Sequence, residues 1–79
     1  MPVHIKLSTT LRLAVPGYDP ARGLTMDVPE GTDVAALIRR LGLERDAIKI
    51  IMIDGRHASL DSPLRGGERV ALFPAVGGG

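Results

Sequence analysis

The sequence ends in Gly77, Gly78 and Gly79, and these three residues offer the clearest chemistry in the chain. A glycine carboxylate is the smallest carboxyl end that a chain can present, because no Cβ obstructs the approach of another molecule. Residues 74–79, when fully extended, reach about 20 Å, which is enough to enter the active site of another protein. The sequence therefore predicts a flexible C-terminal tail that the rest of the chain delivers to a partner.

Two simpler interpretations of the glycines stay open. They could be the remnant of a flexible linker, or a loose chain end without a role, since chain termini are commonly poorly ordered. A linker remnant usually carries serines, whereas these glycines follow a predicted strand directly through Phe73 and Pro74. This continuity favours a functional tail.

The composition excludes several other classes of function. The chain has 79 residues, a net charge of +1, one tyrosine, one phenylalanine, and neither cysteine nor tryptophan. Without cysteine there is no disulfide and no thiolate ligand, and so few aromatic residues cannot build a base-stacking platform. No apolar run approaches the ~18 residues of a membrane span, and no basic-then-apolar leader opens the sequence. We expect a soluble, cytoplasmic protein that binds neither nucleic acid nor membrane.

The side chains assemble no conventional active site. No serine, histidine and acid are recognisable by spacing as a catalytic set, and His57 has no second ligand at metal-binding spacing. Gly66-Gly67 is predicted to be a turn and not a phosphate cradle, because no helix begins after it. We therefore expect no metal site and no bound cofactor. By elimination, the reacting group is the C-terminal carboxylate of Gly79.

A carboxylate at neutral pH is a poor electrophile and must be activated before it reacts. The simplest activation is an acyl-adenylate, which a partner enzyme would make from ATP. Displacement of AMP by a sulfur donor would then leave a thiocarboxylate on Gly79. ATP is thus expected to be used by the partner, and the chain is expected to be a carrier and not an enzyme.

Hydrophobic periodicity predicts the elements that support the tail. Alternating apolar residues indicate strands, and apolar residues at i, i+3, i+4 and i+7 indicate one main helix. In chain order we expect a strand over 3–7, a helical turn over 9–15, a strand over 24–28, a helix over 32–41, a central strand over 48–53, an edge arm over 56–58 and a strand over 69–73. This order predicts an α+β, ubiquitin-like β-grasp domain over residues 1–73, with a mixed four- to five-stranded sheet packed on one main helix. The tail would cover residues 74–79.

Several local features are also predicted. Thr32 is the expected N-cap of the helix, with Asp33 in the first turn. Asp54-Gly55 is a two-residue hairpin turn, and 61–64 is a turn that could form a short 3-10 helix. Tyr18 is expected to fold back from its loop onto the core.

Residue parity along the last strand indicates a partner-binding position. If Val70 and Leu72 point into the core, Phe73 must point to the opposite face. An aromatic residue on an open sheet face, next to the tail, is a natural contact for a partner. The alternative is that Phe73 closes the end of the core. The predicted partner-binding residues are Phe73, Pro74 and Val76.

These residues carry a resemblance to a known family. The segments IDGR from Ile53 and DSPLRGGERVALFP from Asp61, with the final glycine pair, resemble the MoaD/ThiS family of ubiquitin-like sulfur carriers. That family closes its domain with the pattern D-x-P-L-x-x-G-D-x-V-x-x-x-P-x-x-x-G-G. The chain length and the spacing from Pro74 to Gly79 are closest to MoaD, the small subunit of molybdopterin synthase.

The resemblance implies a role and a set of partners. An E1-like enzyme would adenylate Gly79, and a sulfur donor would convert it to a thiocarboxylate. The tail would then enter the large subunit of molybdopterin synthase, where a dithiolene is built on a pterin precursor. The chain would thus act within a sulfurtransferase complex, and Phe73 occupies a position where the family has an apolar partner contact.

Some positions depart from the family pattern. Glu68 replaces the common aspartate, Gly77 extends the terminal pair to three, and Ser8 and His57 lie near positions that usually carry apolar interface residues. The last difference leaves open a tungsten, thiamine or other thiolation pathway. Two further functions also stay open: a ubiquitin-like modifier joined through Gly79 to lysines, and a plain interaction module with an incidental glycine end.

Overall fold

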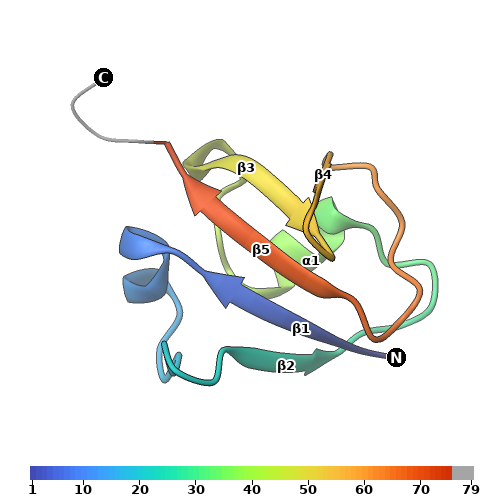
Figure 1. Ribbon diagram of the computed structural model, residues 1–79, viewed down its shortest axis with the longest axis horizontal. Helices are drawn as coiled ribbons and strands as arrows, with labels where there is room; N and C mark the ends of the chain where they lie inside the picture. Colours follow the sequence, from blue (N-terminus) through green and yellow to red (C-terminus); the bar gives the residue numbers. More distant parts are fainter. Residues whose placement is uncertain (76–79) are drawn as a thin grey trace.

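The structure is a computed structural model that describes residues 1–75 of the chain. The predictions made for Val76, Gly77, Gly78 and Gly79 lie outside the described residues. Five strands form one sheet in the order β2-β1-β5-β3-β4, and the helix α1 packs against one face of it (Figure 1). The strands are β1 Pro2–Leu7, β2 Leu24–Asp27, β3 Ile48–Ile53, β4 Arg56–Ala58 and β5 Arg69–Pro74; the helices are α1 Val34–Arg40 and the 3-10 helices η1 Thr9–Ala14 and η2 Arg45–Ala47. The predicted β-grasp fold is confirmed, with five strands.

The last strand occupies the middle of the sheet. β5 pairs in parallel with β1 on one side and antiparallel with β3 on the other. The strand over 48–53 was expected to be central, and the middle position is taken by β5. β3 is an internal strand, with β5 on one side and the short arm β4 on the other.

Alternating residues of β1 and β5 and one face of the helix form the centre of the core. The core side chains with at most 2% of their surface exposed in these elements are Val3, Ile5, Leu7, Val34, Leu37, Ile38, Val70 and Leu72. The alternating apolar residues of the strands and the apolar stripe of the helix therefore face each other across one interface. Their burial provides the main stabilising contribution.

The helix is capped one residue later than predicted. Asp33, and not Thr32, is the N-cap, and its Oδ1 accepts a hydrogen bond of 2.9 Å from the Ala36 N–H. The Thr32 hydroxyl instead donates to the Pro29 carbonyl at 2.6 Å. The predicted cap is therefore wrong, because the threonine side chain closes the preceding turn and leaves the aspartate to accept from the helix.

The segment before β5 completes the helix N-terminus. The Val34 and Ala35 N–H groups donate to the carbonyls of Ser62 and Leu60 at 3.1 and 2.8 Å. These carbonyls satisfy donors that a helix start leaves unpaired. The 3-10 helix considered for residues 61–64 is absent from this described segment, since Pro63 instead forms an isolated bridge with Asp33. A 3-10 helix occurs instead at η2, in the connection between α1 and β3.

Two other local predictions are confirmed. Asp54 and Gly55 both have positive φ angles, of 50° and 81°, as a tight two-residue hairpin turn requires. The Tyr18 side chain packs against the core, and its hydroxyl accepts a 2.8 Å hydrogen bond from the Leu7 N–H. None of the helices within residues 1–75 has the length and apolar character needed to cross a bilayer.

The first residue is held by the hairpin that β1 and β2 form. The Met1 ammonium donates to Asp27 Oδ1 at 2.7 Å and to the Val28 carbonyl at 2.9 Å. The hydrogen bond and the positive charge of this ammonium lower the pKa of the Asp27 carboxyl below its usual value of 3.8. The Met1 carbonyl in turn accepts from the Val28 N–H at 2.9 Å, so the strand pairing extends to the first residue.

The core assignment predicts a strong effect of one truncation. Leu37 has no exposed surface, and Leu37→Ala should lower the free energy of unfolding by about 2–5 kcal/mol, through lost transfer free energy and a cavity. Urea unfolding followed by circular dichroism measures this change. The matched control is Leu13→Ala, because Leu13 is 86% exposed on η1. The control should change the free energy by no more than about 0.5 kcal/mol; equal costs for the two variants would contradict the core assignment.

Candidate functional site

The end of β5 forms the base from which the tail continues. The Ser8 N–H donates to the Leu72 carbonyl at 3.1 Å, so the parallel pairing with β1 extends almost to the end of β5. On the other side, Ile50 pairs with Phe73 and Ile48 pairs with Pro74. The tail is therefore connected to an internal strand that is bonded on both sides.

Pro74 belongs to the strand and not to an unpaired tail. The predicted strand ended at Phe73, yet Pro74 lies opposite Ile48 in the register of β3 and β5. The register shifts between Ile48 and Ile50, and a bulge is one of the few places where a sheet accommodates a residue without an N–H. The division into a domain over 1–73 and a tail over 74–79 stays a prediction.

Phe73 lies on the sheet face that α1 leaves uncovered. Val70 and Leu72 are 1% and 0% exposed, whereas Phe73 is half-buried and lies outside the core cluster. Paired residues of neighbouring strands project from the same face, so Ile50 joins Phe73 there. The predicted outward orientation of Phe73 is confirmed. Its role in partner binding stays a prediction.

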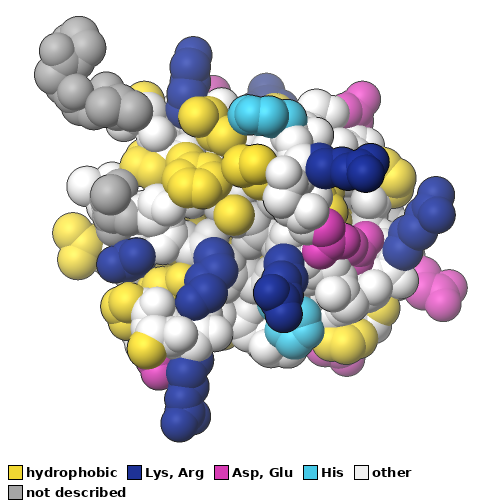
Figure 2. Space-filling model, in the orientation of Figure 1, with side chains coloured by type: hydrophobic (Ala, Val, Ile, Leu, Met, Phe, Trp, Pro, Cys, Tyr) yellow, Lys and Arg dark blue, Asp and Glu magenta, His cyan; other side chains and the backbone are white. Residues whose placement is uncertain are grey.

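A small apolar surface surrounds Phe73 on this open face. We call it the apolar patch, and its members are Ile50, Met52, Ala71 and Phe73. Figure 2 shows apolar side chains gathered over β3 and β5, with basic side chains beside them. Such a patch is a typical contact surface for a protein partner.

Two exposed apolar residues were missed by the sequence interpretation. Ile50 is 38% exposed, although β3 reads as an almost continuous apolar run. The available signal was that a strand covered on one face only must turn every second residue outward. Leu13 is 86% exposed on η1, which contacts β5, whereas Leu11 of the same helix is 4% exposed. No pattern in this short stretch distinguishes the two leucines.

The turn before β5 explains the glutamate that departs from the family pattern. Glu68 accepts hydrogen bonds from the N–H groups of Arg65 at 2.5 Å and of Gly66 at 2.6 Å. Gly66 and Gly67 have positive φ angles of 106° and 84°, so this segment is a turn, as predicted. The Glu68 carbonyl also accepts from the His4 N–H at 2.9 Å, which joins the turn to β1. The glutamate therefore stabilises the entry into β5.

The two positions that usually carry apolar interface residues in the family, Ser8 and His57, lie in different parts of the structure. His57 is exposed on β4 opposite Met52, which places it at the edge of the apolar patch. Ser8 follows β1 and is half-buried, with its N–H used in the pairing with β5. Within residues 1–75, no group of three histidine, aspartate or glutamate side chains is arranged to hold a metal ion.

Comparison with known proteins identifies the family. The model of the ThiS family matches residues 18–79, which is well over half of the chain and includes the terminal glycines. The chain belongs to the ThiS family. This family comprises ubiquitin-like sulfur carriers, so the resemblance noted in the sequence is confirmed. A sequence comparison with curated proteins gives no significant match.

Solved structures support the same fold. A proposed molybdopterin converting factor subunit 1 from Pyrococcus furiosus is 24% identical, with a TM-score of 0.74 over 96% of this chain and 99% of that one. Small archaeal modifier protein 1 from Haloferax volcanii is 22% identical, with a TM-score of 0.73 over 95% and 98% of the two chains. A complex of subunits 1 and 2 of the molybdopterin-converting factor from Helicobacter pylori matches at 18% identity and a TM-score of 0.60, with both chains fully covered. At these identities the matches establish the β-grasp fold.

Leu72 and Phe73 point to opposite faces of the sheet, so their substitution should affect different properties, stability for Leu72 and partner binding for Phe73. Leu72→Ala should cost about 2–5 kcal/mol of stability, whereas Phe73→Ala should cost about 1 kcal/mol or less, because Phe73 loses only its open-face contacts. Phe73→Ala should instead weaken binding of the activating enzyme by about tenfold or more, as measured by calorimetric titration. An unfolded Phe73→Ala variant, or one that binds normally, would contradict the assignment of Phe73 to a contact surface.

Proposed function

We propose that this chain is a sulfur carrier whose C-terminal Gly79 is adenylated and then converted to a thiocarboxylate. The observation that carries the proposal is the match to the ThiS family, which extends to the terminal glycine. The geometry of the described residues supports it, because β5 leads to the tail from the middle of a rigid sheet. The apolar patch lies beside this exit, where an enzyme that receives the tail would make contact.

The proposed reaction uses the partner's active site. A carboxylate oxygen of Gly79 attacks the α-phosphorus of ATP and pyrophosphate leaves. Hydrosulfide, the simplest sulfur donor, then attacks the acyl carbon, AMP leaves, and loss of the S–H proton gives the thiocarboxylate. ATP is bound by an E1-like adenylating enzyme, so the carrier itself needs no cofactor and is not an enzyme. We also propose the cytoplasm, where ATP is available, as its location.

Molybdopterin synthesis is the proposed destination of the sulfur. It is supported by the fold shared with the two molybdopterin-converting proteins, one of which was solved as a complex of subunits 1 and 2. A large subunit of this kind is the proposed acceptor, and His57 would be a polar contact at the edge of its interface. The name of the matching family keeps thiamine synthesis, or another thiolation pathway, as an alternative.

A protein modifier is the second candidate function. The similarity to a small archaeal modifier protein favours it, and it requires the same adenylate. The chain isolated from cells should carry the mass increase of one oxygen replaced by sulfur if it is a sulfur carrier. Adducts of other proteins, joined through an isopeptide bond to Gly79, would support the modifier instead. Intact-mass spectrometry distinguishes these outcomes.

The position of the terminal carboxylate provides the decisive test. One alanine added after Gly79 moves the carboxylate by about 3.5 Å and places a methyl group beside it. Because attack requires reacting atoms within about 3–3.5 Å of each other, ATP–pyrophosphate exchange with the activating enzyme should fall by at least ~10²-fold. The circular dichroism spectrum should not change.

Two further variants complete this test. Deletion of Gly79 should be milder, since Gly77 and Gly78 would still end the chain in a glycine pair, one residue short. Arg39→Gln/Arg40→Gln on α1, which packs on the other face of the sheet, controls for handling of the domain. Full exchange activity of the alanine-extended protein would overturn both the carrier and the modifier proposals, and an interaction module would then be the better description.

A further inference from the structure

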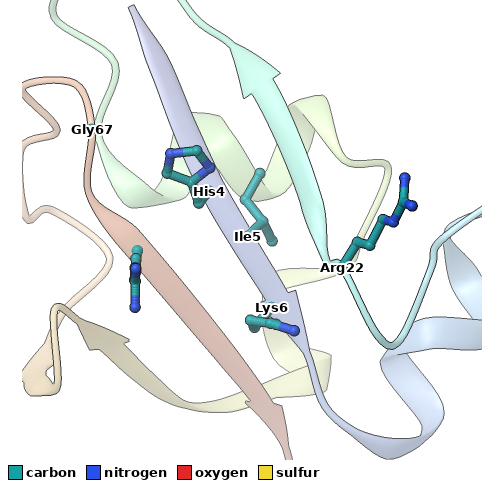
Figure 3. A pocket seen from close by; sticks show the side chains of 6 residues that line it. His4, Ile5, Lys6, Arg22 and Gly67 are labelled. Atoms are coloured by element: carbon teal, nitrogen blue, oxygen red, sulfur yellow. The ribbon is translucent and has the colours of Figure 1, made fainter.

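A hollow lined by basic side chains lies on the open face, next to the apolar patch. Its volume is about 400 Å³, and Figure 3 shows side chains along β1 and on the segment that precedes β2. We call it the basic groove; its lining residues are His4, Ile5, Lys6, Arg22, Gly67 and Arg69. Four of the six can carry a positive charge.

The sheet register brings these basic residues together. His4 lies opposite Arg69 in the parallel pairing of β1 with β5, so both side chains project from the open face. Lys6 follows on the same face of β1. Residues that are far apart in the chain are thereby placed about 4.8 Å apart, one strand spacing.

A glycine allows Lys6 to lie across the end of the β1–β2 hairpin. A Cβ on Gly23 would come within 2.8 Å of the Ile5 carbonyl oxygen and 3.2 Å of Lys6 Cδ. Without that atom, the Lys6 stem passes over the glycine, and its ammonium donates to the Ala21 carbonyl at 3.3 Å. The charge of Lys6 is thus held beside Arg22.

Within residues 1–75, no carboxylate forms a salt bridge with a basic side chain of the groove. The salt bridge of this part of the chain joins the Met1 ammonium to Asp27. Asp19 uses its Oδ1 to accept from the N–H groups of Ala21 and Arg22, at 2.9 and 3.4 Å. Asp54 uses its Oδ1 to accept from the Arg69 N–H at 3.0 Å. Glu68, between Gly67 and Arg69, accepts from the Arg65 and Gly66 N–H groups. These three acids bond to backbone N–H groups, and the four basic side chains of the groove stay exposed.

We propose that the basic groove binds an acidic segment of the partner protein, an extended stretch rich in aspartate or glutamate. This inference rests on the proposed function for the role of that partner, which would also receive the tail. The groove and the apolar patch meet at Ala71, which lies opposite Lys6 on β1 and opposite Met52 on β3. One partner can therefore cover both surfaces, with an apolar centre and an acidic rim.

The groove suits an acidic peptide better than a free anion or a nucleic acid. Its charges are on long, exposed side chains from two strands and a loop, and the Gly67 N–H is already bonded to the Pro2 carbonyl at 2.6 Å. A small anion would therefore find no convergent set of backbone donors. The groove also has no phenylalanine, tyrosine or tryptophan, the large rings on which bases stack most strongly.

A titration of the full-length chain with a hexaglutamate peptide tests the proposal. Amide signals in the groove should shift in ¹⁵N NMR spectra, and the affinity should fall as salt is raised. A hexaglutamine peptide should give no such shifts. The double variant Lys6→Gln/Arg69→Gln should weaken hexaglutamate binding by about fivefold or more, as expected for the loss of two exposed charge contacts. The matched control, Arg39→Gln/Arg40→Gln on α1, should bind like the parent.

Three results would overturn the proposal: shifts spread over the whole surface, equal weakening in the control, or tighter binding of pyrophosphate or a single-stranded oligonucleotide at the same residues. If the double variant does not fold by circular dichroism, Arg22→Gln replaces it, with the same expected direction. The alanine-extended tail variant should bind hexaglutamate normally. Its exchange activity therefore tests the tail chemistry separately from the groove.

Discussion

The parallel pairing of β1 with β5 is the interaction on which the rest of the structure depends. It joins the two ends of the sequence in the centre of the sheet, and it aligns Ile5 and Leu7 with Val70 and Leu72 over the same face of α1. Because β3 bonds to the other side of β5, the last strand has no free edge. A tail that begins here starts from one of the regions least able to open locally.

This arrangement separates the packed face of the sheet from the open face that we propose for recognition. One face is filled by α1 and the side chains that resist unfolding. The other presents the apolar patch and the basic groove, which are built from the alternate residues of the same strands. A substitution on the open face can therefore alter binding without the cost of a cavity, and adjacent positions such as Leu72 and Phe73 belong to different roles.

Much of the fold was predictable because the spacing of apolar residues within each element shows which of its side chains are buried. The alternation in β1 and β5 and the apolar stripe of α1 each repeat with the period of their element. One feature that departed from the prediction depends on distant partners. The carbonyls of Leu60 and Ser62 complete the start of α1, and this long-range bonding replaces the 3-10 helix considered for residues 61–64.

The candidate site was predictable only in part, for the same reason. The parity of β5 was enough to orient Phe73, because Val70 and Leu72 are strong core residues. The exposure of Ile50 depends on which face of the sheet α1 covers. A continuous apolar run such as β3 does not indicate that face. The basic groove depends on the register between β1 and β5 and on the loop that carries Arg22, so no single stretch of sequence contains it.

The parallel direction of β1 and β5 also determines where another domain could be joined. Met1 lies at the end of the sheet where β1 begins, and Ala75 follows the opposite end, where β5 finishes (Figure 1). A strand of this length separates the two ends by about 20 Å. A protein fused ahead of Met1 would thus sit away from the tail and leave its exit open. Such a fusion would convert the Met1 ammonium to an amide with a single N–H, so at most one of its bonds to Asp27 and Val28 could persist.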